Sequence, residues 1–345
     1  MNQQFLEKHM TLHYVGKCIK HIGDKKFMNF VLEDEKNPSR VIFSCLGNEN
    51  PDKNIMIIHN GFPLNGFFAE FRCTLKLLAY ADRYAFVPYI IYDDSYIYSE
   101  QKEINSTCNP FEYFFKQPSG LSYQEVRSSF NVFDSKTLHS YMIDMKHGIK
   151  LSSYDSGEAY IDELALMMRK YIHLNERTQE YIDSSITELF EGKGKVLGVH
   201  HRGTDYKKEY KRHPKFVTLD EKINHIKKVE KDYDKIFVAT DELQAVDELQ
   251  KAFGDKVCYY KDVFRGDGDI SVAYSISKRE NHKYLLGLEV LRDMYTLAKC
   301  NGLIAGISQV SLCAQIAKRS MGNKYDFLEI IDNGIVEEGE YFSVR

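Results

Sequence analysis

Histidine, arginine, threonine and aspartate follow a buried strand in the second half of the chain. The apolar segment 196–200 reads as a strand that ends at His200, and Arg202, Thr204 and Asp205 follow it. In open parallel sheets, ligands bind beyond the carboxyl ends of the strands. An arginine offers a planar fork of donors that matches a phosphate. The segment therefore predicts an anion-binding site, with a surface salt bridge or a cap on the next element as the structural alternative.

Three carboxylates are candidate general bases. Asp205 and Glu209 lie in the loop that follows Arg202, and Glu70 lies at the start of a predicted helix. A carboxylate within hydrogen-bond reach of a reacting hydroxyl is the usual acceptor of its proton. The alternatives are that Asp205 orients Arg202, that the loop carboxylates are solvated, and that Glu70 complements the dipole of its helix.

The elements that position these residues begin with a strand–helix–strand unit in the first half of the chain. Segments 54–59 and 86–92 are apolar and read as strands. Between them, apolar residues recur at helical spacing, at Phe68, Phe71, Leu75 and Leu78. Residues 93–157 are irregular, polar and aromatic, and we expect loops that shape a cleft and contact an acceptor.

Strands and helices alternate through the second half. Two helical stretches run from about 158 to 191, and then strands at 196–200, 236–240, 257–260 and 303–305 alternate with helices at 219–231, 243–253, 284–299 and 312–318. This alternation predicts parallel sheets. We expect an α/β protein with two Rossmann-like, doubly wound domains, residues 1–157 and 158–345, that face each other across a cleft.

The composition is that of an ordinary globular protein. The 345 residues are 43% hydrophobic and 28% charged, with a formal net charge of −4, which argues against disorder and against broad nucleic-acid binding. Seven cysteines without a Cys-x-x-Cys pair favour a reducing compartment and no zinc site. We see neither a signal peptide nor a transmembrane run, and we expect a cytoplasmic location.

Four segments resemble, in order, the motifs of one enzyme superfamily. Gly198 to Asp205, with His213-Pro214 after it, resembles the donor-binding signature of the α1,6-fucosyltransferase and O-fucosyltransferase superfamily. Segments 60–80, 238–242 and 291–310 resemble its glycine loop and helix, its Ala-Thr-Asp strand end, and its last helix with a serine loop. The resemblance covers about 190–320 well, 54–92 faintly, and 93–157 not at all.

The resemblance implies a GT-B fold and an activity. The N-terminal domain would contact the acceptor, and the C-terminal domain would bind the nucleotide sugar. The implied reaction is an inverting, metal-independent transfer of L-fucose from GDP-fucose to a glycan hydroxyl, with no cofactor. One position departs from the α1,6 enzymes: Gly203 stands where they carry a second arginine, which weakens the case for that linkage.

The resemblance also implies roles for individual residues. Arg202 would bind the β-phosphate, His200 and Asp293 would contact the guanine side, and either Ser308 or Ser311 would hold a phosphate oxygen. Glu209 falls near the position of a proposed base. Thr204 and Asp241 complete the predicted donor-binding set, and Asn65 and Glu70 are the predicted acceptor-side residues.

Two other functions fit the same sequence. One is the same fold acting on another GDP-sugar, such as GDP-heptose, and the other is a nucleotide-sugar or glycan-binding protein without turnover. Asp267-Gly268-Asp269 imitates a metal-binding Asp-x-Asp motif, but we read it as a polar turn. Taken with the resemblance, the sequence favours a bacterial enzyme of polysaccharide biosynthesis.

Overall fold

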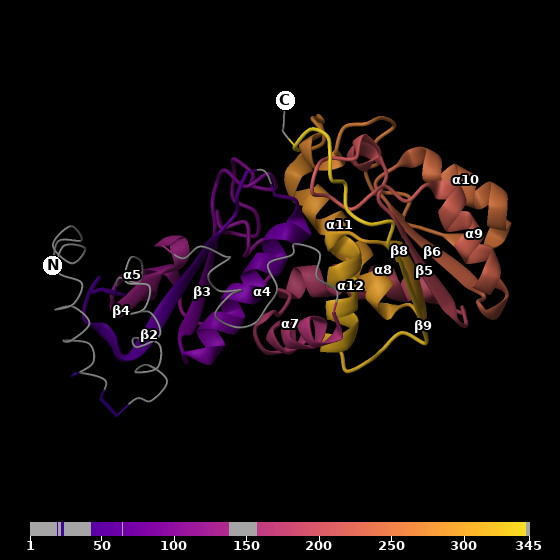
Figure 1. Ribbon diagram of the computed structural model, residues 1–345. Coiled ribbons are helices and arrows are strands. Elements are labelled where there is room, and N and C mark those ends of the chain that lie inside the picture. The colour runs from indigo at the N-terminus through magenta and orange to yellow at the C-terminus, as the bar shows by residue number, and fades with distance from the viewer. Residues whose placement is uncertain (1–18, 20–21, 24–42, 64, 138–156, 343–345) are drawn as a thin grey trace.

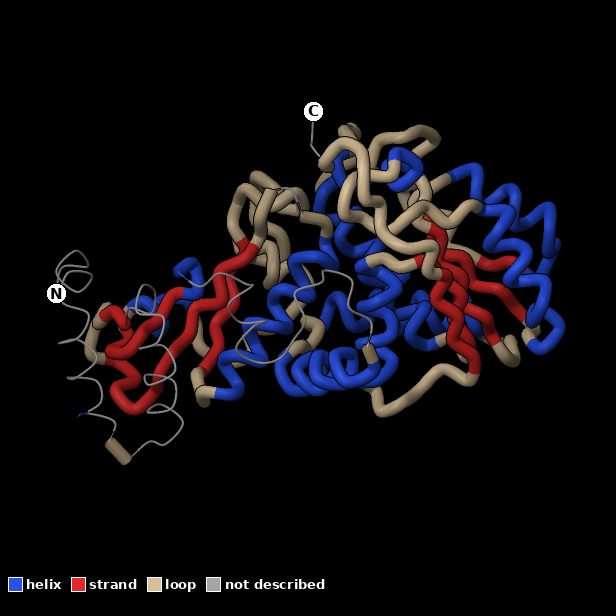
Figure 2. The backbone as a smooth tube through the Cα atoms, viewed as in Figure 1, coloured by secondary structure: helices blue, strands red, loops and turns tan. Residues whose placement is uncertain are grey.

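The computed structural model of the chain describes residues 19, 22–23, 43–63, 65–137 and 157–342. It contains two mainly parallel sheets with a layer of helices between them (Figures 1 and 2). No helix in these ranges is long and apolar enough to cross a membrane. The mixed α/β class with parallel sheets is confirmed, while the division at 157/158 stays a prediction.

The second sheet is five-stranded, parallel throughout, and ordered β7-β6-β5-β8-β9. Its strands are β5 (Val196–His201), β6 (Lys235–Thr240), β7 (Val257–Cys258), β8 (Gly302–Gly306) and β9 (Phe327–Ile331). All six residues of β5 are buried, as expected for a central strand that is covered on both faces. Four of these strands were predicted from the sequence, and β9 was not.

Helices cover both faces of this sheet. They are α8 (Glu176–Phe190), α9 (Leu219–Val229), α10 (Leu243–Phe253), α11 (His282–Lys299) and α12 (Gln309–Ser320). Apolar residues of α9 and α10 share one core cluster with Leu197 and Val199. Residues of α11 and α12 share another with Phe237 and Leu303. Because adjacent strand residues point to opposite faces, each strand contributes to both clusters.

The first sheet has four strands in the order β1-β4-β2-β3. These are β1 (Phe43–Ser44), β2 (Glu49–Asn60), β3 (Val87–Tyr92) and β4 (Ser129–Asp134), with α4 (Phe67–Arg83) between β2 and β3 and the short α5 (Tyr123–Arg127) before β4. Strand β2 runs parallel to β3 and β4, and β1 pairs antiparallel with β4.

Strand β4 corrects the expectation that 93–157 holds only loops. Its segment reads as polar because it contains Ser129 and Asn131, yet both residues are fully buried. The Asn131 amide donates to Asn54 Oδ1 on β2 at 3.2 Å, so a cross-strand hydrogen bond satisfies the buried amide. All six aromatic residues of 93–121 are core residues. Residues 138–156 lie outside the described part of the chain.

One continuous core joins the two sheets through the helical layer. Helices α4, α7 (Glu158–Tyr171) and α12 pack together there, in the centre of Figure 1. Arg72 of α4 donates to Tyr160 Oη on α7 at 2.7 Å and to Gln309 Oε1 on α12 at 2.9 Å. Since Arg72 is only 4% exposed, these bonds fix the start of α12 against α4.

Candidate active site

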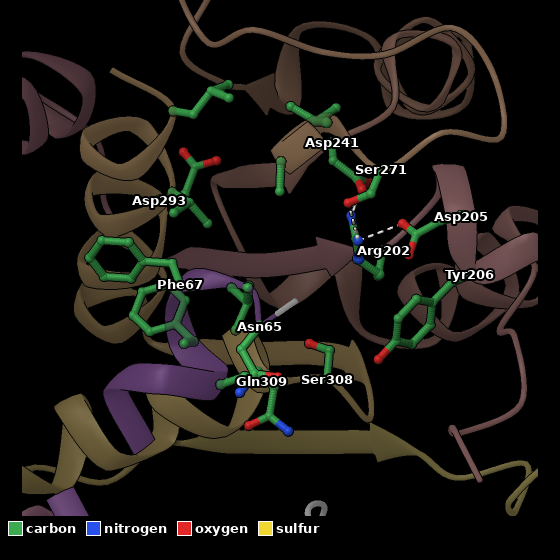
Figure 3. Close-up of a pocket in the computed structure, with 18 of the residues that line it drawn as sticks. Asn65, Phe67, Arg202, Asp205, Tyr206, Asp241, Ser271, Asp293, Ser308 and Gln309 are labelled. Carbon is green, nitrogen blue, oxygen red and sulfur yellow. Dashed lines mark hydrogen bonds and ion pairs between the residues drawn. The ribbon is translucent and has the colours of Figure 1, made fainter. Parts of the chain in front are cut away.

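A cavity of about 400 Å³ lies between the sheets. Its walls are the carboxyl ends of β5 and β6, the first turns of α4 and α12, one face of α11, and the loop segment 271–274 (Figure 3). Its size is that of a small-molecule site. It brings together the predicted residues His200, Arg202, Asp205, Asp241 and Asp293, and also Ser308 and Asn65.

Arg202 enters the cavity from the end of β5. Its Nη2 donates to Asp205 Oδ1 at 2.5 Å and to Ser271 Oγ at 3.1 Å, and its other amine forms an ion pair with Asp241. The guanidinium carbon lies 5.3 Å from the ring centre of Tyr206. The side chain keeps 25% of its surface exposed, so a clamped guanidinium presents its remaining surface to the cavity.

The backbone after Arg202 is held in an unusual conformation. Thr204 has φ +38°, which a β-branched residue rarely adopts. Asp241, at the end of β6, accepts hydrogen bonds from Gly203 N at 2.8 Å and from Thr204 Oγ1 at 2.7 Å. Strain of this kind persists only where the surroundings enforce it, and such residues cluster at functional sites.

Gly203 has no room for a side chain. A Cβ at this position would lie 2.3 Å from Glu242 Oε2 and 2.7 Å from Glu242 Cβ. A residue with a side chain at this position, such as an arginine, would therefore require Glu242 to shift.

Gly203→Ala should lower the free energy of unfolding by about 1–3 kcal/mol, because overpacking a filled site forces backbone shifts. Gly268→Ala is the matched control, since nothing lies within 4 Å of its added Cβ. Denaturant unfolding of both variants measures the difference. An equal effect of the two substitutions would contradict the close contact with Glu242.

A buried polar network lies behind the Arg202 loop, and sequence reasoning missed it. His201 Nε2 lies 3.2 Å from Glu242 Oε2, and Lys207 also pairs with Glu242. Lys222 of α9 donates to His200 O at 2.8 Å and lies 3.4 Å from His201 Nδ1. The sequence signal that could have revealed this network is Lys222, a lysine at a buried position of α9.

Burial sets the charges in this network. It lowers the pKa of His201 to about 4 and that of Lys222 to about 7, because a low-dielectric surrounding disfavours the cationic form. The hydrogen bond from His201, together with that from Lys207, lowers the pKa of Glu242 to about 2 despite desolvation. A neutral His201 that donates from Nε2 to Glu242 leaves its Nδ1 free to accept from Lys222.

The first turn of α12 forms a second wall of the cavity. Ser308 and Ser311 make a reciprocal capping box, in which each hydroxyl accepts from the other residue's backbone N–H. Ser308 Oγ also lies 3.3 Å from His200 Nδ1, and burial holds the pKa of His200 well below its ordinary value. Of the two predicted serines, Ser308 lines the cavity, whereas Ser311 binds back to Gly306 O at 2.8 Å.

Asp293 of α11 lies across the cavity from Arg202 (Figure 3). It is 6% exposed, and its Oδ1 has no hydrogen-bond partner among the described residues. The cavity that it lines also includes the apolar residues Ala239, Val263 and Val290. Burial raises the pKa of Asp293 to about 7, against the opposing charges of Arg265 and Arg292. A buried carboxylate oxygen without a partner is a vacant place for a donor.

The other predicted carboxylates lie elsewhere. Glu209 is exposed, has φ +49°, and accepts from Phe216 N at 3.1 Å. Glu70 is fully buried and accepts from Gly61 N at 3.0 Å and from the Asn65 amide; burial raises its pKa. Neither belongs to the cavity lining, whereas Asp205 and Asn65 do. Glu70 thus holds Gly61 and Asn65 in place by hydrogen bonds, without itself lining the cavity.

Among the residues described, no group of three or more His, Cys, Asp and Glu side chains is arranged to hold a metal ion. Six cysteines fall within the described ranges, and each is a free thiol.

Neither the protein-family models nor the curated proteins gave a match to this chain. Solved structures similar to it include NodZ alpha-1,6-fucosyltransferase soaked with GDP-fucose, at 18% identity over 77% of this chain and 93% of that chain, with a TM-score of 0.45. They also include POFUT1 in complex with GDP-fucose, at 13% identity over 84% of this chain and 100% of that chain, with a TM-score of 0.45. A third is fucosyltransferase NodZ from Bradyrhizobium, at 17% identity over 77% and 92%, with a TM-score of 0.41.

Proposed function

We propose that the chain is an inverting glycosyltransferase that moves L-fucose from GDP-fucose to a glycan hydroxyl without a metal ion, in a cytoplasmic setting. One observation carries the proposal. A single cavity holds an arginine fork and a helix N-terminus on one side and a buried carboxylate with a vacant oxygen on the other. This arrangement suits a ligand with a diphosphate at one end and a hydrogen-bond-donating base at the other. The motif around Arg202 supports the same donor.

The diphosphate would bind between Arg202 and the first turn of α12. Arg202 supplies a charged fork, which suits a phosphate. The α12 N-terminus adds the positive end of a twelve-residue helix, and the Ser308 hydroxyl lies beside it. Leaving of GDP places growing negative charge on the β-phosphate. Preorganised donors at that place stabilise the transition state more than the ground state.

The base would bind at Asp293. Guanine presents two adjacent donors, N1–H and the exocyclic N2 amino group, which an ionised carboxylate accepts together. Adenine offers an acceptor at N1 and no 2-amino group, so Asp293 favours guanine over adenine. The apolar residues of the cavity lining, such as Val263 and Val290, would bury the faces of the ring.

The transfer requires a proton acceptor. The acceptor oxygen forms a bond to C1 of the sugar, the bond from C1 to the phosphate oxygen breaks, and its electron pair leaves on GDP. The proton of the acceptor hydroxyl goes to a carboxylate. Of the three carboxylates considered from the sequence, only Asp205 lines the cavity, so we take Asp205 as the candidate base. Its contact with Arg202 would be exchanged when the diphosphate binds.

Release of GDP tests this function. Wild-type protein is mixed with GDP-fucose and a panel of acceptor glycans, and free GDP is measured with and without EDTA. We expect acceptor-dependent release that EDTA leaves unchanged. Thermal shifts with GDP-fucose, GDP-mannose and a UDP-sugar compare the donors, and GDP-fucose should stabilise most. Binding of GDP without acceptor-dependent release would indicate a binding protein, and loss of activity in EDTA would contradict metal-independent transfer.

A further inference from the structure

The last described residues fold back across the loop that carries Arg202. We call residues 332–342 the C-terminal strap. Backbone hydrogen bonds pin it to the loop: Val336 N donates to His213 O at 2.9 Å, and Lys211 N donates to Glu340 O at 2.8 Å. Two further bonds join Arg212 and Lys215 to the strap at 2.8 and 2.9 Å. The strap therefore holds a defined path over the loop.

The strap brings one aromatic ring to the cavity. Phe342 belongs to the cavity lining. Its ring lies edge-on to Tyr210 with centroids 5.1 Å apart, and 6.0 Å from the ring of Tyr274. Tyr274 and Tyr206 also line the cavity. We call Tyr206, Tyr274 and Phe342 the aromatic wall, and its members come from three segments far apart in the sequence.

The aromatic wall lies at the phosphate end of the cavity. Tyr206 faces the Arg202 guanidinium at 5.3 Å (Figure 3). Tyr274 follows Ser271, which accepts a hydrogen bond from Arg202 at 3.1 Å. Burial, with the nearby charge of Asp205, raises the pKa of Tyr274 to about 12, so its ring stays neutral. Asp293 lies across the cavity from Arg202, which separates the wall from the proposed base site.

We propose that the aromatic wall binds the apolar face of a pyranose ring next to Arg202, and that Phe342 of the strap determines how well that ring is held. This inference rests on the proposed function, because a sugar bonded to a diphosphate on Arg202 must lie beside the guanidinium. A pyranose has faces of C–H groups, and a 6-deoxy sugar adds a methyl group. Aromatic rings bury such surface with little loss of conformational freedom. The ring is either the transferred sugar or the acceptor sugar, and both present this chemistry.

The neighbouring residue provides a matched control. Tyr341 is 56% exposed and lies over Lys211 and Arg212, with centroid distances of 5.5 and 5.7 Å. It does not belong to the cavity lining. A substitution there perturbs the strap without changing the wall.

The experiment compares Phe342→Leu, Phe342→Tyr and Tyr341→Leu with wild-type protein. Calorimetry gives the Kd for GDP and for GDP-fucose, and initial rates give the acceptor KM. Phe342→Leu should leave the Kd for GDP unchanged. It should either raise the Kd for GDP-fucose or raise the acceptor KM, by about tenfold, which is the size expected for losing one aromatic contact. Phe342→Tyr should restore the wild-type value, and Tyr341→Leu should have no effect.

The two sources of the sugar give different results. Weaker GDP-fucose binding places the transferred sugar on the wall, whereas a raised acceptor KM alone places the acceptor there. The inference is overturned if Phe342→Leu changes neither quantity, or if it weakens GDP and GDP-fucose equally. Failure of wild-type protein to bind GDP would instead overturn the proposed function, before any variant is compared.

Discussion

Arg202→Ala should reduce kcat by about 10²–10³-fold, because it removes a preorganised donor from the place where the leaving diphosphate gains charge. It also leaves Asp205 and Asp241 facing the diphosphate without the cation that now lies between them. Their repulsion should weaken GDP binding further. Steady-state rates of GDP release and calorimetry measure the two effects.

Two further variants make the result specific to Arg202. Arg202→Lys keeps the charge but loses the fork, so we expect an intermediate rate. Lys208→Ala removes a positive charge from an exposed position of the same loop that does not line the cavity, and it should leave the rate unchanged. Circular dichroism and Tm establish that each variant is folded. A folded Arg202→Ala protein with the wild-type rate would show that the phosphate binds elsewhere.

Asp293→Asn should weaken GDP binding by about 100-fold. The substitution keeps the size of the side chain but removes the charge that accepts two donors of guanine, and a hydrogen bond to a charged group contributes roughly 1.5–3 kcal/mol. Inosine diphosphate, which lacks the 2-amino group, should bind wild-type protein more weakly than GDP does. The Asn variant should bind the two nucleotides with similar affinity, and calorimetry with both gives the comparison.

The pH dependence follows from the same carboxylate. Burial raises the pKa of Asp293 to about 7, so below that pH a ligand that requires the ionised form must displace a proton. The affinity of wild-type protein for GDP-fucose should fall by up to tenfold for each pH unit below 7, and the Asn variant should not follow it. GDP-fucose is the right probe because its diphosphate has no ionisation near pH 7.

The free energy of unfolding should change with pH in the direction opposite to the affinity for GDP-fucose. Because the pKa of Asp293 is raised on folding, the folded chain holds a proton that the unfolded chain has lost, and the free energy of unfolding declines as pH rises from about 4 to 7. The Tm of Asp293→Asn relative to wild type should therefore increase between pH 5 and pH 8. A constant difference in Tm would mean that Asp293 is ionised throughout this range in the folded protein.

The proposed role of Asp293 in binding the base would account for a residue that is unfavourable for stability at this position. A buried carboxylate with a vacant oxygen costs stability when it is ionised. The same vacancy is what a base with two donors would fill. Arg265 and Arg292 offset part of the cost, since their charges lower the pKa of Asp293 against the effect of burial.

The sequence by itself determined the local elements and one residue of the cavity lining, Arg202. Alternating apolar runs and helical periodicity predicted β5, β6, β8, α10 and α11 within a few residues, because each pattern depends on neighbours a few positions away. The polar run after β5 predicted Arg202 as a ligand-binding residue, since a strand's carboxyl end is a recurrent ligand site in parallel sheets, and the structure places Arg202 in the cavity lining. Strand β4 was not predicted because Ser129 and Asn131 are residue types that are usually exposed. The sequence does not show that β2 brings Asn54 against Asn131.

Only the tertiary structure decided which candidates share a site. Asp293 and Ser308 line the same cavity as Arg202 because α11 and α12 pack on the sheet that contains β5. Glu209 lies outside the cavity, although it comes only a few residues after Arg202. Phe342 reaches the same cavity from the end of the described chain. The spacing of residues along the sequence shows the periodicity within one helix or strand, but it does not show how far apart two elements lie in the folded chain. Those distances are set by packing, and packing also separated the carboxylates that line the cavity from those that do not.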